Sequence, residues 1–121
     1  MFSIDSRSRV AIYEQLVQNI IGLIARGVLQ PDDQLPSVRN LARDLGINPN
    51  TVQKAYQKLE TKGMIYQAAG RGSFIAPGES LTDSIVQQKL KEARPPILSA
   101  KRAGVPRERM LALVDEIYEK E

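Results

Sequence analysis

The residues best suited to chemistry lie along one side of a segment near the middle of the chain. Amides and a hydroxyl come first and cations follow, at Asn50, Thr51, Gln53, Lys54, Gln57 and Lys58. Asn and Gln can bond bidentately to adenine, Thr can bond a base edge or touch a thymine methyl, and Lys can reach guanine or phosphate. On a helix, this face would suit the major groove of DNA, although a solvated amphipathic face carries similar residues.

A second feature, Gly70-Arg71-Gly72, places one cation between two residues without side chains. Such a tip can approach a sugar-phosphate wall closely, and arginine suits a narrow minor groove. Taken alone, an ordinary glycine-rich turn with a solubilising arginine explains the triplet equally well. The order and spacing of the two features favour a shared role in DNA binding.

Other chemistry finds little support. The chain contains neither cysteine nor histidine, which excludes disulfides and thiolate metal sites and removes the commonest general base. Asp32-Asp33 is the only adjacent acidic pair outside the tail, and the turn around Pro31 explains it. We therefore predict that the chain is not an enzyme, with no catalytic residues, no metal site and no cofactor.

Three helices must position these groups. The first carries apolar residues at helical spacing and ends near Gly27, with its stripe at Tyr13, Leu16, Val17, Ile20, Ile21 and Ile24. The second follows the N-cap Ser37 and ends at Gly46. The third follows the N-cap Asn48, has proline at its first position, runs over about 48–62, and buries Val52, Ala55, Tyr56 and Leu59.

The second and third helices are joined by a tight turn, which is typical of a helix-turn-helix. Two β-prone runs, 64–67 and 73–76, flank the glycine-rich tip and predict a hairpin. Helix, helix-turn-helix and hairpin form a winged helix, so we predict an α+β, mostly helical fold. Arg39 lies one turn into the second helix, where its charge opposes the helix dipole and a phosphate contact would explain it.

The remaining chain predicts a helical tail. A helix over 81–94 should kink or break at Pro95-Pro96, resume over 97–103, and be followed by a last helix opening at Pro106. We predict a homodimer interface formed by the apolar residues of this tail, Leu90, Ile97, Leu98, Met110, Leu113, Val114, Ile117 and Tyr118. The alternative is that the last helix caps the winged helix within one chain. The predicted domains are residues 1–77, which bind DNA, and residues 78–121, which dimerise.

Charge and hydropathy agree with this division. Nine basic and six acidic residues lie up to Ala76, against eight of each beyond it, so the whole net charge of +3 belongs to the first part. An anionic partner should therefore bind there. No apolar run approaches a membrane span, and the first five residues lack a signal-peptide layout. We predict a cytoplasmic protein without a membrane partner.

These residues resemble the GntR family of bacterial regulators. The resemblance rests on residues 27–31 and 35–42, on Leu45-Gly46-Ile47-Asn48-Pro49-Asn50-Thr51-Val52-Gln53-Lys54-Ala55-Tyr56, on Leu59, Glu60 and Gly63, and on residues 70–75. The short tail is similar to the YtrA subfamily, whose members dimerise through two helices. The large effector domains of other branches would not fit after Ala76.

The resemblance implies a sequence-specific transcription regulator, usually a repressor, that binds a palindromic operator in double-stranded DNA as a homodimer. The recognition helix would enter the major groove, and the wing, residues 64–76, would lie near the minor groove. Pro49 and Gln53 stand where some relatives carry base-reading arginines, so the operator should differ from theirs. The predicted DNA-binding residues are Ser37, Arg39, Asn48, Asn50, Thr51, Gln53, Lys54, Gly70, Arg71 and Gly72.

Two other functions stay open on the sequence. A winged helix can bind protein instead of nucleic acid, although the basic recognition face and Gly-Arg-Gly tip argue against it. A small-molecule effector in the tail is compatible with the sequence, but no residue indicates one.

Overall fold

The computed structural model describes residues 2–78 and 81–120. These residues form five α-helices and one two-stranded antiparallel sheet. Contacts divide the chain into two compact units, one ending at Val86 and the other beginning at Gln87. The division falls inside the fourth helix, and the boundary that the sequence predicts after residue 77 stays a prediction.

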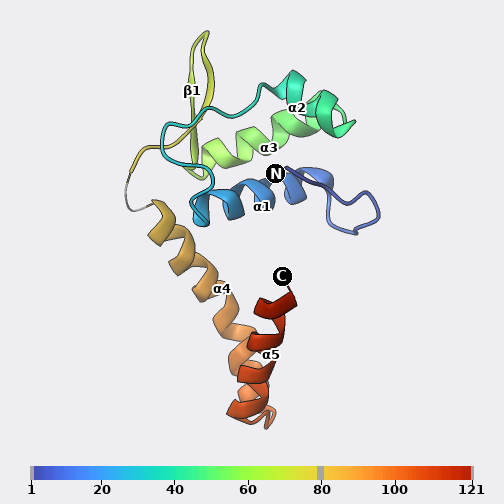
Figure 1. Cartoon of the computed structure of the whole chain (residues 1–121), viewed down its shortest axis with the longest axis vertical. Coiled ribbons are helices and arrows are strands. Elements are labelled where there is room, and N and C mark those ends of the chain that lie inside the picture. Colours follow the sequence, from blue (N-terminus) through green and yellow to red (C-terminus); the bar gives the residue numbers. More distant parts are fainter. Residues whose placement is uncertain (1, 79–80, 121) are drawn as a thin grey trace. The chain divides into compact units, whose positions relative to one another are not determined.

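Three helices build the first unit: α1 (Ile12–Ala25), α2 (Val38–Leu45) and α3 (Pro49–Thr61) (Figure 1). Helix α3 packs against both α1 and α2 and therefore lies at the centre of the unit. The apolar stripes predicted for α1 and α3 face this core, in which Leu16, Ile20, Val52 and Leu59 have no exposed surface. Burial of these side chains is what fixes α3 relative to its neighbours.

The caps predicted for α2 and α3 are confirmed. Ser37 Oγ accepts a hydrogen bond of 3.1 Å from the Asn40 N–H, and Gly46 ends α2 with a φ of 67°. Asn48 Oδ1 accepts one of 2.8 Å from the Asn50 N–H. Each side chain satisfies an N–H that the helix leaves without a partner, so the turn between α2 and α3 is set locally.

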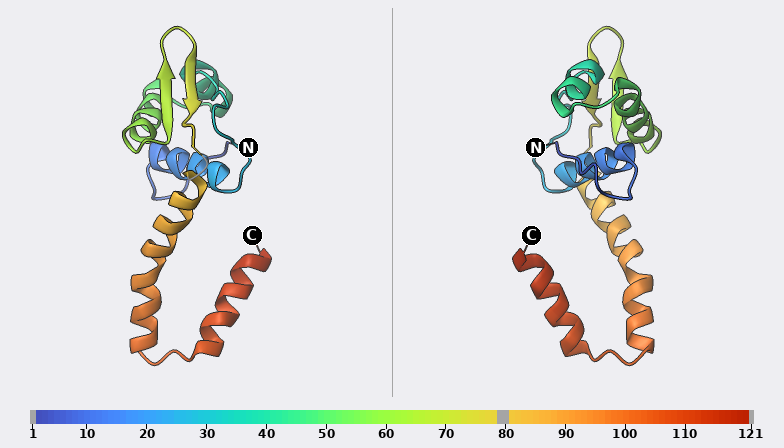
Figure 2. Two further views of the ribbon diagram at one scale, coloured as in Figure 1. Left: turned by 90° about the vertical axis from the view of Figure 1, so that its left-hand side faces the viewer. Right: turned by 90° about the vertical axis from the view of Figure 1, so that its right-hand side faces the viewer.

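The hairpin consists of β1 (Ile65–Ala68) and β2 (Gly72–Ile75), with Ile65 opposite Ile75 and Ala68 opposite Gly72. Its base packs against α3, with Ile65 and Ile75 in the core, and Figure 2 shows its tip projecting beyond the helices. The segment before α2 extends its pairing, because the Leu35 N–H donates to Ser73 O and the Ile75 N–H donates to Asp33 O, at 2.9 and 2.8 Å. These elements confirm the predicted winged helix.

The tail consists of α4 (Leu81–Arg102) and α5 (Arg107–Lys120), which diverge as they leave the turn that joins them (Figure 2). The sequence predicts a kink or a break at Pro95-Pro96. The break is wrong, since α4 runs through both prolines as one helix. Both prolines are exposed. Water can therefore bind the carbonyls that lose a helical donor, which lowers the penalty of the two missing N–H groups.

The start of α4 belongs to the first unit. Ile85 is only 3% exposed and is part of the winged-helix core. Among the described residues, no helix combines the length and the apolar character that crossing a bilayer requires.

Candidate nucleic-acid interface

Helix α3 separates into a buried and an exposed side, as the sequence predicts. Tyr56 is fully buried, and its hydroxyl donates to Pro36 O at 2.7 Å. Burial raises the pKa of this phenol, so the hydroxyl stays a donor. The exposed side carries Asn50, Gln53 and Lys54, while Thr51 is half-buried. The amides and the ammonium thus project from the first two turns of the helix.

Two predicted DNA-binding residues already serve as caps. Ser37 Oγ and Asn48 Oδ1 each accept a backbone N–H, so their oxygens are engaged. The Ser37 hydroxyl hydrogen and the Asn48 side-chain NH₂ remain suited to donate to an acceptor. Ser37 is exposed at the start of α2, and Asn48 is exposed at the start of α3 beside Asn50 and Thr51. Phosphate oxygens would find hydrogen-bond donors at both places.

The lysines of α3 are held by α1. Lys54 Nζ lies 4.0 Å from the centre of the Tyr13 ring, within cation–π range. Lys58 forms an ion pair with Glu14, and both side chains are partly exposed. The hydrogen bond between them lowers the pKa of the Glu14 carboxyl and raises the pKa of the Lys58 ammonium. The sequence placed Lys58 on the outward face, but the structure directs it to α1.

The first residues of α1 and α3 enclose an open hollow of about 480 Å³. It is lined by Ala11, Ile12, Tyr13, Asn50, Thr51 and Lys54. The start of α1 therefore lies beside the residues predicted to read bases. The sequence analysis did not predict that the start of α1 lies beside the start of α3. Helical periodicity indicates which face of a helix is buried, but not which other segment its end contacts.

Helix α2 presents Arg39 at the surface, in the first turn after Ser37. Arg43, one turn later, donates from Nη2 to Asn40 Oδ1 at 3.0 Å. Arg43 is thus engaged within its own helix, whereas Arg39 keeps the position that the sequence predicted for a phosphate contact.

The wing tip requires its glycines. Gly70 and Gly72 have φ values of 74° and 120°, which L side chains rarely adopt. A Cβ on Gly72 would also lie 3.0 Å from Gln34 Nε2. That Nε2 donates to Arg71 O at 2.9 Å, so the Gln34 side chain braces the tip from the segment before α2.

The Arg71 guanidinium lies against an aromatic pair. Its Cζ is 5.8 Å from the Phe74 ring centre, and Phe74 stacks on Tyr66 at 5.5 Å. The Tyr66 hydroxyl donates to Asp32 Oδ1 at 2.8 Å, and this bond raises the pKa of Tyr66. The sequence indicated Arg71 but not these supports, of which Tyr66 and Phe74 belong to the hairpin itself and Asp32 to the segment before α2.

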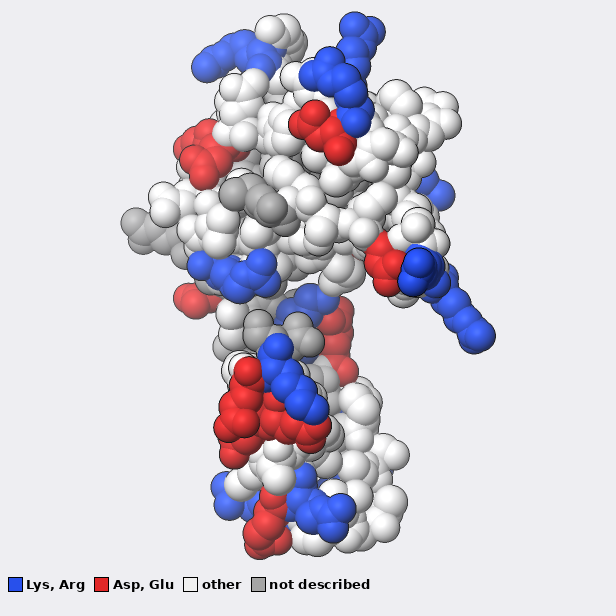
Figure 3. Space-filling model, turned by 45° about the vertical axis from the view of Figure 1, so that its right-hand side comes forward, with Lys and Arg blue, Asp and Glu red and all other residues white. Residues whose placement is uncertain are grey.

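Positive charge on one face of the winged helix is arranged as separate groups. On the face that Figure 3 shows, Lys and Arg side chains project at several places over this unit with acidic residues between them. The described residues contain no group of three candidate metal ligands.

The tail exposes the apolar residues predicted for a dimer interface. In the single chain, Leu90 is 61% exposed and Tyr118 82%, and no residue of α5 is buried. Met110 is half-buried, and Ile97, Leu98, Leu113, Val114 and Ile117 are exposed. The sequence prediction left out Val86, Val105 and Leu111, which are exposed as well.

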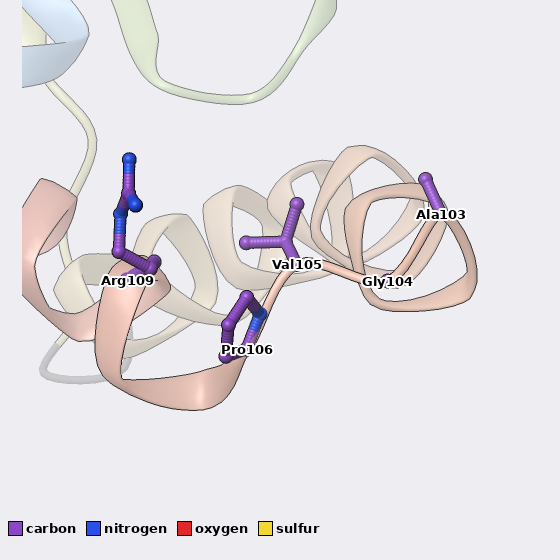
Figure 4. Close-up of a pocket in the computed structure, with 5 residues that line it drawn as sticks. All are labelled: Ala103, Gly104, Val105, Pro106 and Arg109. Atoms are coloured by element: carbon purple, nitrogen blue, oxygen red, sulfur yellow. The ribbon is translucent and has the colours of Figure 1, made fainter.

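The turn between α4 and α5 forms a shallow hollow of about 310 Å³. Figure 4 shows Val105 and Arg109 projecting to the same side of this turn, near the Pro106 ring. Arg109 is the one charged residue of its lining, and the hollow is open to solvent. We assign no ligand to it.

Comparison with known proteins decides the family. The profile of the bacterial regulatory proteins of the gntR family matches residues 12–75, which is the winged helix from α1 to the end of β2 and more than half of the chain. The chain belongs to the GntR family. The family consists of regulators and not of enzymes, in agreement with the sequence prediction.

One GntR relative covers nearly the whole chain. The HTH-type transcriptional repressor YtrA of Bacillus subtilis (strain 168) is 40% identical over 97% of this chain and 92% of its own length. The prediction that the chain belongs to the YtrA-like branch of the GntR family is thereby confirmed, and the sequence similarity extends through the tail. The chain is a DNA-binding transcription regulator of this type.

Solved structures of GntR proteins agree with the fold. A GntR family transcriptional regulator from Listeria monocytogenes has a TM-score of 0.79 and 30% identity, covering 93% of this chain and 98% of that chain. The AraR DNA-binding domain, solved in complex with the operator ORE1, has a TM-score of 0.54 and 28% identity over 63% of this chain and 93% of that chain.

Proposed function

We propose that this GntR regulator is a repressor that binds a palindromic operator as a homodimer in the cytoplasm. Helix α3 enters the major groove and the wing lies at the minor groove. The observation that carries the proposal is the polar, exposed start of α3, which carries Asn50, Gln53 and Lys54. Asn50 and Lys54 also line the hollow that α3 shares with the start of α1. A recognition helix reads bases mainly through its N-terminal residues.

The wing supports the same orientation. Arg71 is exposed at the tip of the hairpin, and its backbone carbonyl is held by the Gln34 side chain. Because the tip is already ordered, binding DNA would cost little backbone conformational entropy there. An arginine so placed suits the narrow minor groove beside the bases that α3 reads. The AraR complex with its operator supports DNA as the partner of this type of domain.

The tail supports the homodimer. Many apolar side chains on α4 and α5 are exposed to solvent in the single chain, which is unfavourable in water. The same surface of a second copy would bury them. A dimer presents two recognition helices related by a two-fold axis, and a palindromic operator has matching symmetry. The repressor activity is inferred from the named repressor YtrA.

The test is a fluorescence-anisotropy titration with a labelled duplex taken from upstream of the protein's own gene. A scrambled duplex of equal length is the control, and each titration is repeated at several KCl concentrations. We expect saturation at two chains per site and clearly tighter binding to the upstream duplex. Weak, equal and strongly salt-dependent binding to both duplexes would show phosphate attraction alone and contradict sequence-specific recognition.

A further inference from the structure

We propose that the loop Asp5–Val10, which precedes α1, is a second DNA-binding element in which Arg7 and Arg9 bind backbone phosphates beside the groove that α3 reads. The inference rests on the proposed function and extends it to a segment outside the helix-turn-helix and the wing. Its ligand is the sugar-phosphate backbone of double-stranded DNA, independent of base sequence.

The loop is held in place by one side chain of α1. Gln15 Oε1 accepts the Asp5 N–H at 2.6 Å, and Gln15 Nε2 donates to Asp5 O at 2.9 Å and to Val10 O at 2.8 Å. Both ends of the loop are thus tied to the same amide. A segment of six residues that solvent surrounds would otherwise sample many conformations.

Bonds inside the loop fix its backbone further. Asp5 Oδ1 accepts the Arg7 N–H at 2.9 Å, and Ser8 Oγ accepts the Val10 N–H at 3.1 Å. Asp5 is the one acid of the loop, and this bond occupies one of its oxygens with backbone. Arg7 and Arg9 are exposed, so the loop presents two cations from an ordered backbone.

The position of the loop points to DNA. Val10 leads directly into Ala11, and Ala11, Ile12 and Tyr13 line the hollow whose other wall is Asn50, Thr51 and Lys54. Two residues of chain span at most about 7 Å, so the Arg9 backbone lies close to that hollow. A phosphate beside the start of α3 is therefore within the region that an arginine side chain from this loop can reach.

The position of the loop favours phosphate over an acidic protein surface. A forked guanidinium matches carboxylate as well as phosphate oxygens, but this loop lies next to the hollow at the start of the helix proposed to read bases, where backbone phosphates would pass. Two cations on an ordered backbone next to a base-reading helix would fix the register of that helix on the duplex. The loop would thus contribute affinity and positioning, and α3 the choice of sequence.

The test compares Arg7→Ala/Arg9→Ala with Lys91→Ala/Arg94→Ala, which removes the same charge from exposed positions of α4. Both are titrated with the upstream duplex and with its scrambled control over a range of KCl concentrations. Counterion release gives a slope of about 0.9 in log Kd against log salt for each phosphate contact. We expect the loop variant to lose roughly two units of slope per chain, with an unchanged preference for the upstream duplex.

A charge-neutral variant tests the ordering of the loop. Gln15→Ala keeps both arginines and places a good helix former in α1. We expect it to weaken binding to both duplexes by a smaller factor than the loop variant does. Affinity equal to that of the unchanged protein would overturn the claim that Gln15 organises the loop for DNA.

The outcomes separate the two proposals. If the unchanged protein fails to bind either duplex at low salt, the proposed function fails and this inference fails with it. If the unchanged protein binds but the loop variant has the slope of the Lys91→Ala/Arg94→Ala control, only the loop inference is overturned. Circular dichroism of all variants checks that the fold is retained.

Discussion

The residues of α3 divide into those that hold the helix and those that are free to contact DNA. Asn50 is exposed at the first turn, its backbone N–H donates to Asn48, and its side-chain amide has no hydrogen bond to the part of the chain that the structure describes. Its side-chain amide is therefore able to form the two hydrogen bonds that identify adenine.

Replacing Asn50 with alanine should relax sequence preference. We expect a loss of roughly 1–3 kcal/mol on the upstream duplex and little change on the scrambled one. Parallel anisotropy titrations measure both values. An equal loss on both duplexes would show that Asn50 does not read bases.

Gly72 and Gly70 allow two substitutions at the wing tip to be compared. Gly72→Ala places a Cβ 3.0 Å from Gln34 Nε2 at a φ of 120°, whereas Gly70→Ala meets nothing within 4 Å at a φ of 74°. Forcing a side chain into the left-handed region costs about 1–2 kcal/mol. We expect Gly72→Ala to weaken DNA binding more than Gly70→Ala, because its φ lies further from values that L residues adopt and because its Cβ would displace the brace on Arg71. Equal effects would contradict both reasons.

Tyr56 links the core to the start of α2. Tyr56→Phe removes the hydroxyl that donates to Pro36 O and leaves the ring in place. The expected destabilisation is about 1 kcal/mol, typical for a neutral hydrogen bond. Urea denaturation followed by circular dichroism measures it, and unchanged stability would show that water replaces the hydroxyl without loss.

At the scale of elements, α4 is the helix whose sequence and structure disagree most. Each proline in a helix interior is about 3 kcal/mol less favourable than alanine. Pro95→Ala/Pro96→Ala should therefore raise the helicity and stability of the tail, by at most that amount per position. Circular dichroism at 222 nm during urea denaturation tests this, with Ser99→Ala as the control in the same helix. A decrease in helicity would contradict a continuous α4.

The sequence predicted elements more reliably than the contacts between them. Helices α1, α2 and α3 and their caps follow from local rules, because Ser37, Gly46 and Asn48 act on N–H groups and turns only a few residues away. The bond from Gln34 to Arg71 joins residues 37 positions apart, and the pair Glu14–Lys58 joins residues 44 apart. Such pairs depend on how helices and hairpin pack, and neither periodicity nor propensity carries that information.

Proline is the case in which a local rule was too strict. The clash and the missing donor at Pro95-Pro96 are real, but the rest of a 22-residue helix supplies enough hydrogen bonds on either side to keep it continuous. The residue type predicts the free-energy cost of proline at one position, but the length of the surrounding helix decides whether the helix breaks there.

At the scale of the whole molecule, the proposed homodimer depends on the tail. Leu113 and Ile117 are one turn apart on α5 and about half exposed in the single chain. Leu113→Glu/Ile117→Glu should shift the protein to monomers, since two carboxylates would be buried in an apolar interface. Sedimentation equilibrium measures the mass, and Asp115→Ala on the same helix is the control. An unchanged mass would place the interface elsewhere or contradict the dimer.

The clean separation of the two sides of α3 also bears on how such regulators evolve. Val52, Ala55, Tyr56 and Leu59 hold the helix, and none of the residues on its polar face contributes to the buried core. Mutations at exposed positions of that face such as Asn50 and Gln53 should therefore change folding stability little. After gene duplication, a copy of this protein could drift to a new operator through a few viable intermediates, so diversity of target genes would arise without redesign of the scaffold.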